Sequence, residues 1–432
     1  MAERRPLPVG LYLALSRFSG PLYRLVHEIR ARQGKDDPAR RGERFGRPGR
    51  PRPAGSLVWV HAASVGETNS VLPLIHHMTA GGQTVLLTTV TRTSAAIAAK
   101  SLPPGAIHQY APFDSPVFLD RFLDHWQPAA ALFVESEIWP AMFDAVRRRD
   151  CPLVLVNGRM SSRSYRGWSR LPGTAHYVFA SITLTLAQSE EDGRRLGALG
   201  CGHVVYPGNL KFDASTAPAD PVELDRLSTM IGSRPVWVAA LTHPGEEELA
   251  LAAHRQILNS HPDALLLLCP RHPERGAQID TLIGEQGFTS VRRSLGKTPK
   301  PDCQVFLGDT LGEMGLFYSL APVAFLGGSF AEKGGHNPVE AIRFGSALIS
   351  GPGVANARGL YHDLWDAQAA VKLEDAGDLA AAVLRLMEDQ SARDTQIATA
   401  RAIADSGKGA VERTMAHLRP LLAANPAAAG TE

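Results

Sequence analysis

Short apolar runs alternate with segments of helical periodicity along almost the whole chain from Ser56 onward. Several of these runs are apolar enough to be buried on both faces, as the strands of a parallel sheet are. The alternation therefore predicts an α/β fold with parallel sheets. The expected strands are Leu57–Ala62, Thr84–Thr89, Ala129–Val134, Leu153–Asn157 and Leu184–Ala187, followed by Val236–Ala240, Ala264–Cys269, Val305–Leu307, Pro322–Leu326 and Ala347–Ser350.

Helical patterns fit between these runs. With 432 residues, of which 44% are hydrophobic and 20% charged, the chain has an ordinary globular composition and room for two domains of roughly 150–200 residues each. We expect two doubly wound α/β domains that face each other across a cleft. The expected helices include Glu67–Met78, Pro140–Arg149, Glu190–Leu199, Gly245–Leu258, Glu274–Glu285, Pro338–Phe344 and Ala376–Asp389.

Composition also places the domain boundaries. The run Ala217–Pro221 is small, polar and broken by proline, which is typical of an interdomain connector. We therefore expect a first domain at 56–215, a linker at 216–232, a second domain at 233–420 and a disordered tail at 421–432.

The N-terminal segment, residues 1–55, has apolar residues at helical spacing followed by a basic run. The apolar stretch is interrupted well short of the roughly 20 residues that a membrane span requires, and it lacks the pattern of a signal peptide. One interpretation is an amphipathic helix on an anionic membrane surface; the other is a helix packed on the first domain, with a flexible basic linker. The apolar positions are Leu11, Leu15, Phe18, Leu22 and Val26, the interruptions are Arg17, Gly20 and Pro21, and the basic run extends from Arg24 to Arg52.

Glu67 follows the first expected strand at the start of a helix, after the small-residue turn Ala62–Gly66. Ligands of open parallel sheets bind outside the carboxyl ends of the strands, so an acid at this place is a candidate catalytic group. The positive end of the helix dipole favours the ionised form of Glu67, which indicates a base. The alternative is that Glu67 only complements the dipole.

In the second half, glycines surround a short turn before a helix. Gly327 and Gly328 follow an expected strand, and Gly334 and Gly335 precede a helix that Pro338 opens. Glycines let backbone N–H groups approach an anion, so this region suits a phosphate, although such turns also occur for steric reasons. Neither a dinucleotide-binding fingerprint nor a P-loop is present. Glu340 in that helix is placed to accept hydrogen bonds from ribose hydroxyls.

Other turns at strand ends carry charged side chains. Arg271 offers the planar donor fork that suits a phosphate, and the turns of this domain together favour a nucleotide over a set of simple helix caps. In the first domain, Arg92 and Lys211 suit an acidic substrate group, whereas Glu135 and Glu137 suit hydroxyl activation or stabilisation of positive charge. The alternative is that these acids and bases pair with each other.

Metal and disulfide sites are not expected. The four cysteines are scattered singly, without the spacing of zinc ligands or of a disulfide framework. The formal net charge of +2 leaves the nature of the partner to be inferred from local charge. The cysteines are Cys151, Cys201, Cys269 and Cys303.

The motifs taken together resemble those of the 3-deoxy-D-manno-octulosonic acid (Kdo) transferases. They occur in order between His61 and Pro352, as H-A-A-S-V-G-E, E-S-E-I-W-P, N-G-R-M-S-S-R-S, G-N-L-K-F-D, T-H-P-G-E-E-E, P-R-H-P-E-R, G-D-T-L-G-E-M and G-G-S-F-A-E-K-G-G-H-N-P-V-E. The resemblance implies the GT-B architecture of two Rossmann-like domains, with an N-terminal membrane-associating helix. It also implies inverting transfer of Kdo from CMP-Kdo to a lipid A precursor, lipid IVA, in lipopolysaccharide core biosynthesis.

The resemblance implies roles for individual residues. Glu67 matches the family's general base, and Lys211 and the E-S-E segment match positions that support the transition state, with Glu137 favoured over Glu135. Arg92 matches a residue that contacts a carboxylate or phosphate. The positions that match CMP-binding elements are Pro270, Arg271, Gly312, Glu313, Met314, Asn337, Pro338, Val339 and Glu340.

The resemblance further implies a glycosyltransferase without metal or cofactor, at the cytoplasmic face of the inner membrane. Attachment is expected to be peripheral or through a single N-terminal anchor, with anionic lipid as a partner. Nucleic acid is not expected to be a partner. Two alternatives remain: another GT-B nucleotide-sugar transferase that acts on a lipid-linked acceptor, and a non-catalytic nucleotide-binding protein of the same fold.

Overall fold

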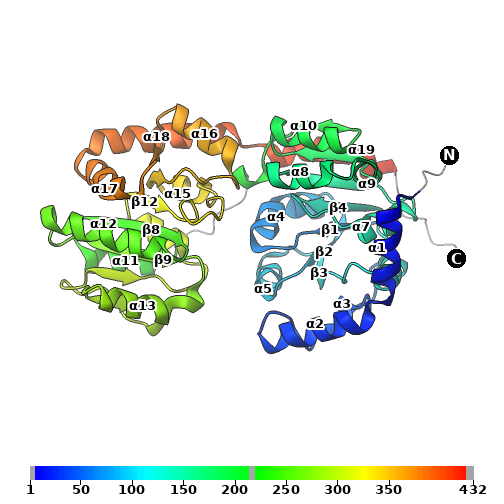
Figure 1. Ribbon diagram of the computed structural model, residues 1–432, viewed down its shortest axis with the longest axis horizontal. Helices are drawn as coiled ribbons and strands as arrows, with labels where there is room; N and C mark the ends of the chain where they lie inside the picture. The colour runs from blue at the N-terminus through cyan, green and yellow to red at the C-terminus, as the bar shows by residue number, and fades with distance from the viewer. Residues whose placement is uncertain (1–4, 214–218, 425–432) are drawn as a thin grey trace. The chain divides into compact units, whose positions relative to one another are not determined.

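The computed structural model describes residues 5–213 and 219–424. The chain divides into two compact units, which are drawn together in Figure 1. Unit 1 comprises Met1–Ala214 and Gly407–Glu432, and unit 2 comprises Ser215–Ser406. Each unit is a parallel sheet with helices on both faces, so the expected doubly wound α/β class is confirmed.

The sheet of unit 1 is parallel throughout and, within residues 5–213, has the strand order β3-β2-β1-β4-β5-β6-β7. The chain builds outward from β1 to β3 and then returns to the other side of β1 with β4. This reversal creates a topological switch point at the carboxyl ends of β1 and β4, where open α/β sheets bind ligands. The strands are β1 Leu57–His61, β2 Thr84–Thr89, β3 Ala106–Tyr110, β4 Ala130–Val134, β5 Leu153–Gly158, β6 Leu184–Ala187 and β7 Val204–Val205.

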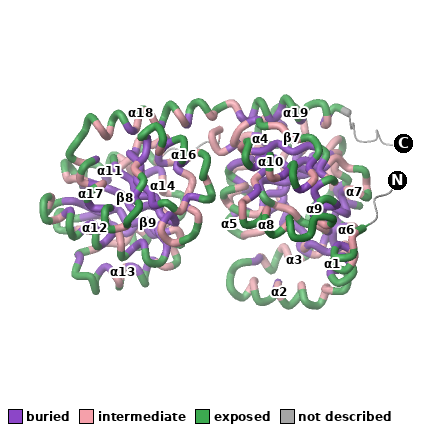
Figure 2. Tube along the Cα trace, turned by 45° about the horizontal axis from the view of Figure 1, so that its top comes forward, coloured by how far each residue is buried: buried purple, intermediate pink, exposed green. Residues whose placement is uncertain are grey.

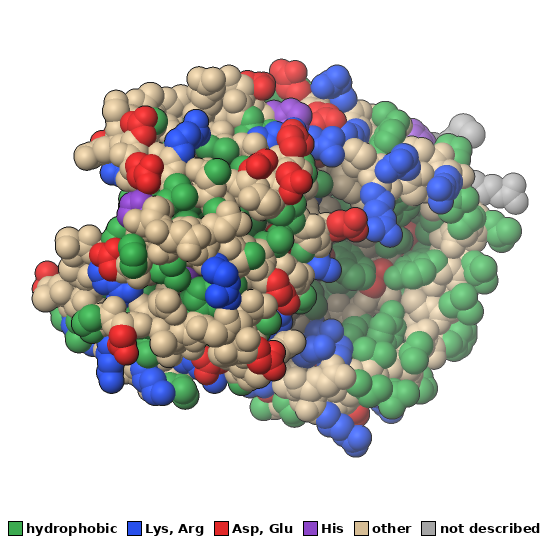
Figure 3. Space-filling view, turned by 60° about the vertical axis from the view of Figure 1, so that its left-hand side comes forward, with side chains coloured by type: hydrophobic (Ala, Val, Ile, Leu, Met, Phe, Trp, Pro, Cys, Tyr) green, Lys and Arg blue, Asp and Glu red, His purple; other side chains and the backbone are tan. Residues whose placement is uncertain are grey.

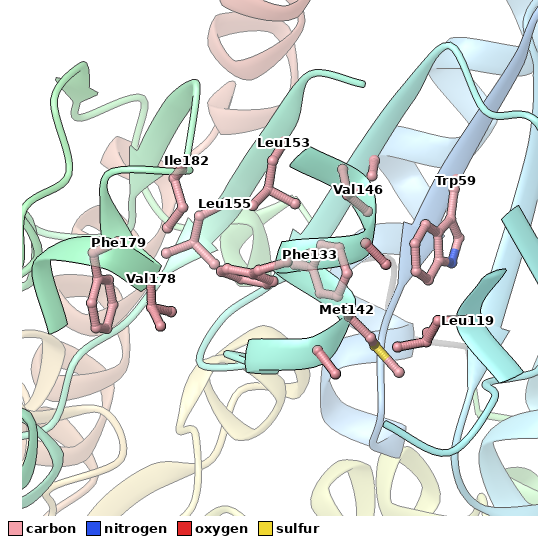
Figure 4. Packing of buried hydrophobic residues seen from close by; sticks show 14 of the residues in the cluster. Trp59, Leu119, Phe133, Met142, Val146, Leu153, Leu155, Val178, Phe179 and Ile182 are labelled. Atoms are coloured by element: carbon pink, nitrogen blue, oxygen red, sulfur yellow. The ribbon is translucent and has the colours of Figure 1, made fainter. Parts of the chain in front are cut away.

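Alternate side chains of the central strands of unit 1 enter two different cores. Trp59 of β1 and Phe133 of β4 pack on one face of the sheet, with their ring centroids 5.1 Å apart (Figure 4). Val58 and Val60 of β1 point to the other face. Both faces are thus covered by helices, as the continuous apolar runs predict. These helices are α4 Val65–Ala80, α5 Arg92–Ser101, α6 Pro116–Trp126, α7 Pro140–Arg147, α8 Ser162–Ser169, α9 Pro172–Phe179, α10 Glu190–Leu199 and the short η1 Leu210–Phe212.

The C-terminal helix α19, Ala410–Ala424, belongs to unit 1, although the sequence placed residues up to 420 in the second domain. Its apolar residues, such as Met415 and Leu418, join the core formed by β1 and β4. The carboxylate of Asp213 accepts hydrogen bonds from the backbone N–H groups of Gly409 and Val411 at 2.7 and 2.6 Å, which fixes the start of this helix. Residues 421–424 of the expected disordered tail are therefore helical, and 425–432 lie outside the described residues.

Unit 2 repeats the plan. Within residues 219–406 its parallel sheet has the order β10-β11-β9-β8-β12-β13-β14, and its switch point lies at the carboxyl ends of β8 and β12. Its strands are β8 Val236–Thr242, β9 Leu265–Pro270, β10 Ser290–Arg292, β11 Val305–Leu307, β12 Val323–Leu326, β13 Ala347–Ser350 and β14 Val371–Lys372.

Helices cover both faces of this second sheet. The expected linker 216–232 includes a helix of unit 2, α11, in which Leu227 is buried; residues 216–218 lie outside the described ranges. The helices are α11 Pro221–Ile231, α12 Glu246–Ser260, α13 Gly276–Glu285, α14 Met314–Leu320, α15 Val339–Phe344, α16 Arg358–Asp366, α17 Leu379–Glu388 and α18 Gln390–Ser406, with the short η2 Pro273–Arg275, η3 Arg293–Leu295 and η4 Ala376–Asp378.

The N-terminal segment forms α1 Leu7–Phe18, α2 Gly20–Arg32 and α3 Arg41–Arg44, and most of α2 is exposed in Figure 2. The basic run after α2 is packed against the rest of unit 1, so the flexible linker that one of the two interpretations included is not found. Arg44 is buried, forms an ion pair with Asp36 at 2.5 Å, and lies over the ring of Tyr110. None of the helices in the described ranges combines the length and the apolarity needed to cross a membrane.

Candidate active site

Glu67 lies at the switch point of unit 1, in the first turn of α4. Its Oε2 accepts hydrogen bonds from the backbone N–H of Ala63 at 2.7 Å and of Ser64 at 3.3 Å. The Ser64 hydroxyl in turn accepts from the backbone N–H of Glu67, which completes a capping box. The helix therefore fixes the orientation of the Glu67 side chain through one carboxylate oxygen.

The electrostatics around Glu67 oppose the effect that the helix dipole predicts. Burial and the carboxylates of Glu137 and Glu135 raise the pKa of Glu67 to about 7, against the hydrogen bond from Ala63. The expectation that the helix end keeps Glu67 ionised is therefore wrong, because desolvation and two like charges outweigh the dipole. A carboxyl group with a pKa near neutrality is well matched to taking up a proton.

Glu135 follows β4 and is buried, with a backbone φ of 57°. Its Oε1 forms an ion pair with Nζ of Lys211 at 2.5 Å. Lys211 is presented by the turn η1, which is held to the sheet where Asn157 Oδ1 accepts from the backbone N–H of Leu210 at 3.0 Å. The structure thus brings two predicted residues together as an ion pair beside Glu67.

Glu137 completes the group of carboxylates and has different partners. Its Oε2 accepts a hydrogen bond from the Trp139 indole at 2.6 Å and lies 3.5 Å from Nε2 of His61. Burial alone would raise the pKa of Glu137, but His61 and Trp139 hold it below its usual value. Glu137 therefore stays ionised beside Glu67, whose proton it makes harder to remove. We call Glu67, Glu135 and Glu137 the acidic cluster.

His61 had no role in the sequence analysis, and the structure gives it one. It is fully buried, and its Nδ1 lies 2.9 Å from Oγ1 of Thr88, which also accepts a hydrogen bond from the Trp59 indole. This network holds the His61 ring toward Glu137. Alternation in β1 places His61 on the same face as Trp59, which was the available signal.

Arg92 is the predicted residue that stands apart from this group. It is exposed at the first position of α5, and its Nη1 donates to the carbonyl of Gly34 at 3.2 Å. It follows β2, one strand away from the switch point.

The switch point of unit 2 is organised by a buried carboxylate. Glu246 accepts hydrogen bonds from the backbone N–H groups of His243, Gly328 and Phe330 at 3.0, 2.7 and 3.0 Å. These contacts join the turn after β8 to the glycine turn after β12. Gly328 has a φ of +72°, and a Cβ there would meet the His336 ring at 3.2 Å, so glycine is required.

Two arginines of the P-R-H-P-E-R segment have opposite environments. Arg275 forms a bidentate pair with the buried Glu247, at 2.8 and 3.3 Å. The half-buried Arg271 has no carboxylate within salt-bridge distance in the described part of the chain. The structure thus leaves Arg271 available to an anion, whereas Arg275 has a structural role.

Glu313 is bound by an arginine that the sequence analysis did not single out. Arg293 donates to both of its carboxylate oxygens, and the Thr310 hydroxyl also donates to it. The contact with Arg293 lowers the pKa of Glu313. Glu313 also lines an open pocket of about 720 Å³, a volume in the range of small-ligand sites. Gly312, with a φ of 81°, and Met314, the first residue of α14, flank it.

The remaining predicted residues lie at the carboxyl end of β9 and around the start of α15. Pro270 is the last residue of β9, and Asn337 Oδ1 accepts from the backbone N–H of Val339 at 3.2 Å, next to Pro338. Burial raises the pKa of Glu340, for which no hydrogen-bond partner is present among the described residues. Across both described ranges, there is no group of three His, Cys, Asp or Glu side chains that could hold a metal ion.

Comparisons with known proteins point to one family. The family model described as 3-deoxy-D-manno-octulosonic-acid transferase (kdotransferase) matches residues 39–214. The chain is 32% identical over 400 residues to the 3-deoxy-D-manno-octulosonic acid transferase of Haemophilus influenzae, covering 89% of this chain and 92% of that one. It is 35% identical to the enzyme of that name from Bordetella pertussis, covering 94% and 97%.

Solved structures show the same fold in more distant proteins. UDP-GlcNAc 2-epimerase from Neisseria meningitidis, bound to UDP-GlcNAc, matches with a TM-score of 0.57 at 13% identity, covering 84% of this chain and 100% of that one. At this identity the likeness concerns the fold alone.

Proposed function

The chain belongs to the Kdo transferase family of GT-B glycosyltransferases, and we propose that it moves Kdo from CMP-Kdo to a lipid A precursor with Glu67 as the general base. The observation that carries the assignment of the base is the place of the Glu67 carboxylate, which the backbone of Ala63 and Ser64 holds at the switch point of unit 1, where burial and Glu137 raise its pKa to about 7. A base of this strength is able to hold the proton of an acceptor hydroxyl and to release it to water near neutral pH.

Its neighbours in the acidic cluster keep Glu67 in this range. Glu137 supplies a fixed negative charge, while Lys211 neutralises Glu135. The anomeric carbon of the donor gains positive character as the nucleotide leaves, and the cluster's carboxylates suit the stabilisation of that charge. We assign this electrostatic role to Glu137 in preference to Glu135, because Glu135 is already paired.

Unit 2 supplies the groups for the nucleotide. The guanidinium of Arg271, which has no carboxylate partner in the described part of the chain, suits the phosphate, which gains negative charge as the glycosidic bond breaks. Glu340 has no hydrogen-bond partner within the described ranges, and ribose hydroxyls would satisfy it. The backbone around Gly312 and Met314 and the turn at Asn337, Pro338 and Val339 complete the proposed CMP site.

The direct test is an assay with CMP-Kdo and lipid IVA, followed by mass measurement of the product. We expect the acceptor to gain the mass of Kdo and CMP to be released in equal amount. Thermal shifts with CMP, UMP and UDP provide the comparison, and only a binding nucleotide raises the melting temperature. Stabilisation by UDP alone, with no transfer from CMP-Kdo, would favour a different nucleotide-sugar transferase.

We also propose that α1 and α2 attach the enzyme to the cytoplasmic face of the inner membrane. Both helices expose large apolar side chains: Leu7 is 85% exposed and Phe18 is 80% exposed. Hydrophobic side chains gather at the right-hand edge of Figure 3, where part of unit 1 is seen. Apolar side chains beside a basic segment suit an anionic leaflet. The other exposed large apolar residues of α1 and α2 are Leu11, Tyr12, Leu15, Leu22, Leu25 and Ile29.

A flotation experiment tests the attachment. The triple substitution of Leu11, Leu15 and Phe18 by Ser removes exposed apolar area without touching the buried Val9 and Leu13, so the fold is expected to persist. We expect the wild type to float with phosphatidylglycerol vesicles and this variant to remain in the bottom fraction of the gradient. Val222→Ser, in unit 2, is the matched control because Val222 is 76% exposed. Equal flotation of all three proteins would contradict the proposal.

A further inference from the structure

Two histidines meet at the switch point of unit 2 and have no part in the roles assigned above. Nε2 of His243 lies 3.1 Å from Nε2 of His336, and the two rings meet edge to edge, with an interplanar angle of 2° and centroids 5.3 Å apart. His243 follows β8 and His336 precedes α15, so the pair joins the two turns that form the switch point. We call these two residues the histidine pair.

The contact between the two rings restricts where their protons lie. One Nε2 must donate to the other, so in the neutral pair one Nδ1 carries a proton and the other does not. When the pair takes up a proton, one Nε2 still donates to the other and both Nδ1 atoms carry N–H. No partner for Nδ1 of His243 is present among the described residues.

The surroundings of the pair are cationic. Arg271, His272 and Lys333 act electrostatically on His243, and the ring centroid of His272 lies 5.7 Å from that of His243. Arg271 and His272 also act electrostatically on His336. The one nearby carboxylate that acts on His243, Glu246, is occupied by three backbone N–H groups. Burial and these cations keep the pair neutral: burial lowers the pKa of His336 to about 4, and it also lowers the pKa of His243.

A phosphate group beside Arg271 would reverse this balance. An anion at that place offsets the cations and offers an acceptor to an N–H at Nδ1 of His243. We propose that the histidine pair takes up one proton from solvent when the phosphate of the nucleotide binds, and that Nδ1–H of His243 then faces the phosphate. The inference rests on the proposed CMP site and adds to it a charge that appears only with the ligand.

A positive charge on the histidine pair would stabilise the leaving group of the proposed reaction. In the nucleotide sugar the phosphate is a diester with one negative charge. When the bond to the anomeric carbon breaks, its electron pair passes to the phosphate oxygen. The resulting phosphate monoester carries a second negative charge, and the pKa of this second ionisation is about 6. A protonated His243 offsets that charge, while the acceptor's proton passes separately to Glu67. The proton on the pair returns to solvent when CMP dissociates.

The sign of proton exchange on CMP binding tests the proposal. Free CMP at pH 7 holds about a tenth of a proton on its phosphate, and binding to fixed cations alone would release it. We expect instead an uptake of about half to one proton per CMP, measured by calorimetry of the full chain in buffers of different ionisation enthalpy. Net release by the wild type, with CMP bound, would overturn the inference.

One variant keeps a hydrogen-bonding group in place of Nε2 but removes the ring that is proposed to face the phosphate. In His243→Gln the side-chain amide replaces Nε2 and cannot take up a proton. We expect this variant to bind CMP without proton uptake, with a melting temperature showing that it folds, whereas His272→Gln, a neighbour outside the pair, keeps the uptake. Uptake that persists in His243→Gln would refute the assignment. Absence of any CMP binding by the wild type would instead refute the proposed function and, with it, this inference.

Discussion

The two units use the same topology to build sites of opposite charge. In unit 1 the turns at the switch point bring three carboxylates together, and the pKa of Glu67 rises to about 7. In unit 2 the equivalent turns bring arginine, lysine and histidine together, and the pKa of His336 falls to about 4. Both shifts favour the neutral form of a buried group. The sheet therefore sets the place of the chemistry, and the loop residues set its sign.

The largest effect is expected from Glu67→Gln, which tests the chemical role of the acidic cluster. Glutamine keeps the acceptor of the capping box but cannot take up a proton, so kcat should fall by a factor on the order of 10²–10⁴ while the protein remains folded. Steady-state kinetics and a thermal melt measure the two properties. Ser64→Ala is the control, because it weakens the cap and keeps the carboxylate. A near-normal kcat in Glu67→Gln would show that Glu67 is not the general base.

Lys211→Met tests whether the acidic cluster depends on its counterion. The substitution leaves Glu135 buried without its partner, so the free energy of unfolding should fall by about 3 kcal/mol. Denaturant titration measures the loss. Adding Glu135→Gln should restore most of it, because the uncompensated charge is then gone. A single variant as stable as the wild type would show that the ion pair is not a structural element of unit 1.

The sequence predicted the central strands of both units better than the edge strands. The central strands were predicted to within about two residues, because a strand buried on both faces leaves a continuous apolar run. The edge strands β3, β7, β10 and β14 were missed, since short or half-buried strands such as Ala106–Tyr110 lack such a run. The helix α19 was placed in the wrong unit because its apolar face does not reveal which sheet it covers.

The candidate site shows the same limit. Turn residues such as Glu67 and Arg271 were found because strand ends and motifs are local features of the sequence. The groups that set their electrostatics were not found, since His61, His336 and Arg293 become neighbours only through the fold. Even the direction of the Glu67 shift was wrong: the dipole of its own helix is visible in the sequence, whereas burial and the approach of Glu137 are not.

Arg271→Met and Arg275→Met separate binding from stability within unit 2. Arg271 has no carboxylate partner in the described ranges, so its loss should leave stability nearly unchanged and weaken CMP binding by about 10–100-fold, the value of a charge-assisted hydrogen bond. Arg275 pairs with the buried Glu247, so its loss should lower the melting temperature instead. Calorimetry and thermal melts decide; unchanged CMP affinity in Arg271→Met would refute the phosphate site.

A smaller effect is expected from Glu137→Gln on the pH dependence of turnover. Activity should rise with pH through about 7 as Glu67 loses its proton. Because the charge of Glu137 raises the pKa of Glu67, its removal should move this acidic limb to lower pH, whatever happens to the maximal rate. A pH profile of kcat measures the shift. A limb that stays in place would show that the charge of Glu137 does not set the pKa of Glu67.

The smallest effect, on stability, should have opposite signs in the two units. Folded Glu67 keeps a proton that the unfolded chain has lost between its ordinary pKa of 4.5 and about 7, so its contribution to stability falls as pH rises through that window. Folded His336 lacks a proton that the unfolded chain binds between its ordinary pKa of 6.5 and about 4, so its contribution falls as pH drops. Glu67→Gln should therefore melt about 2–4 °C above the wild type near pH 8, and His336→Asn should lose less stability than the wild type between about pH 7 and pH 5. If the melting temperatures of all three proteins change with pH in the same way, neither Glu67 nor His336 has a pKa shifted by the fold. The contrast between the units would then rest on geometry alone.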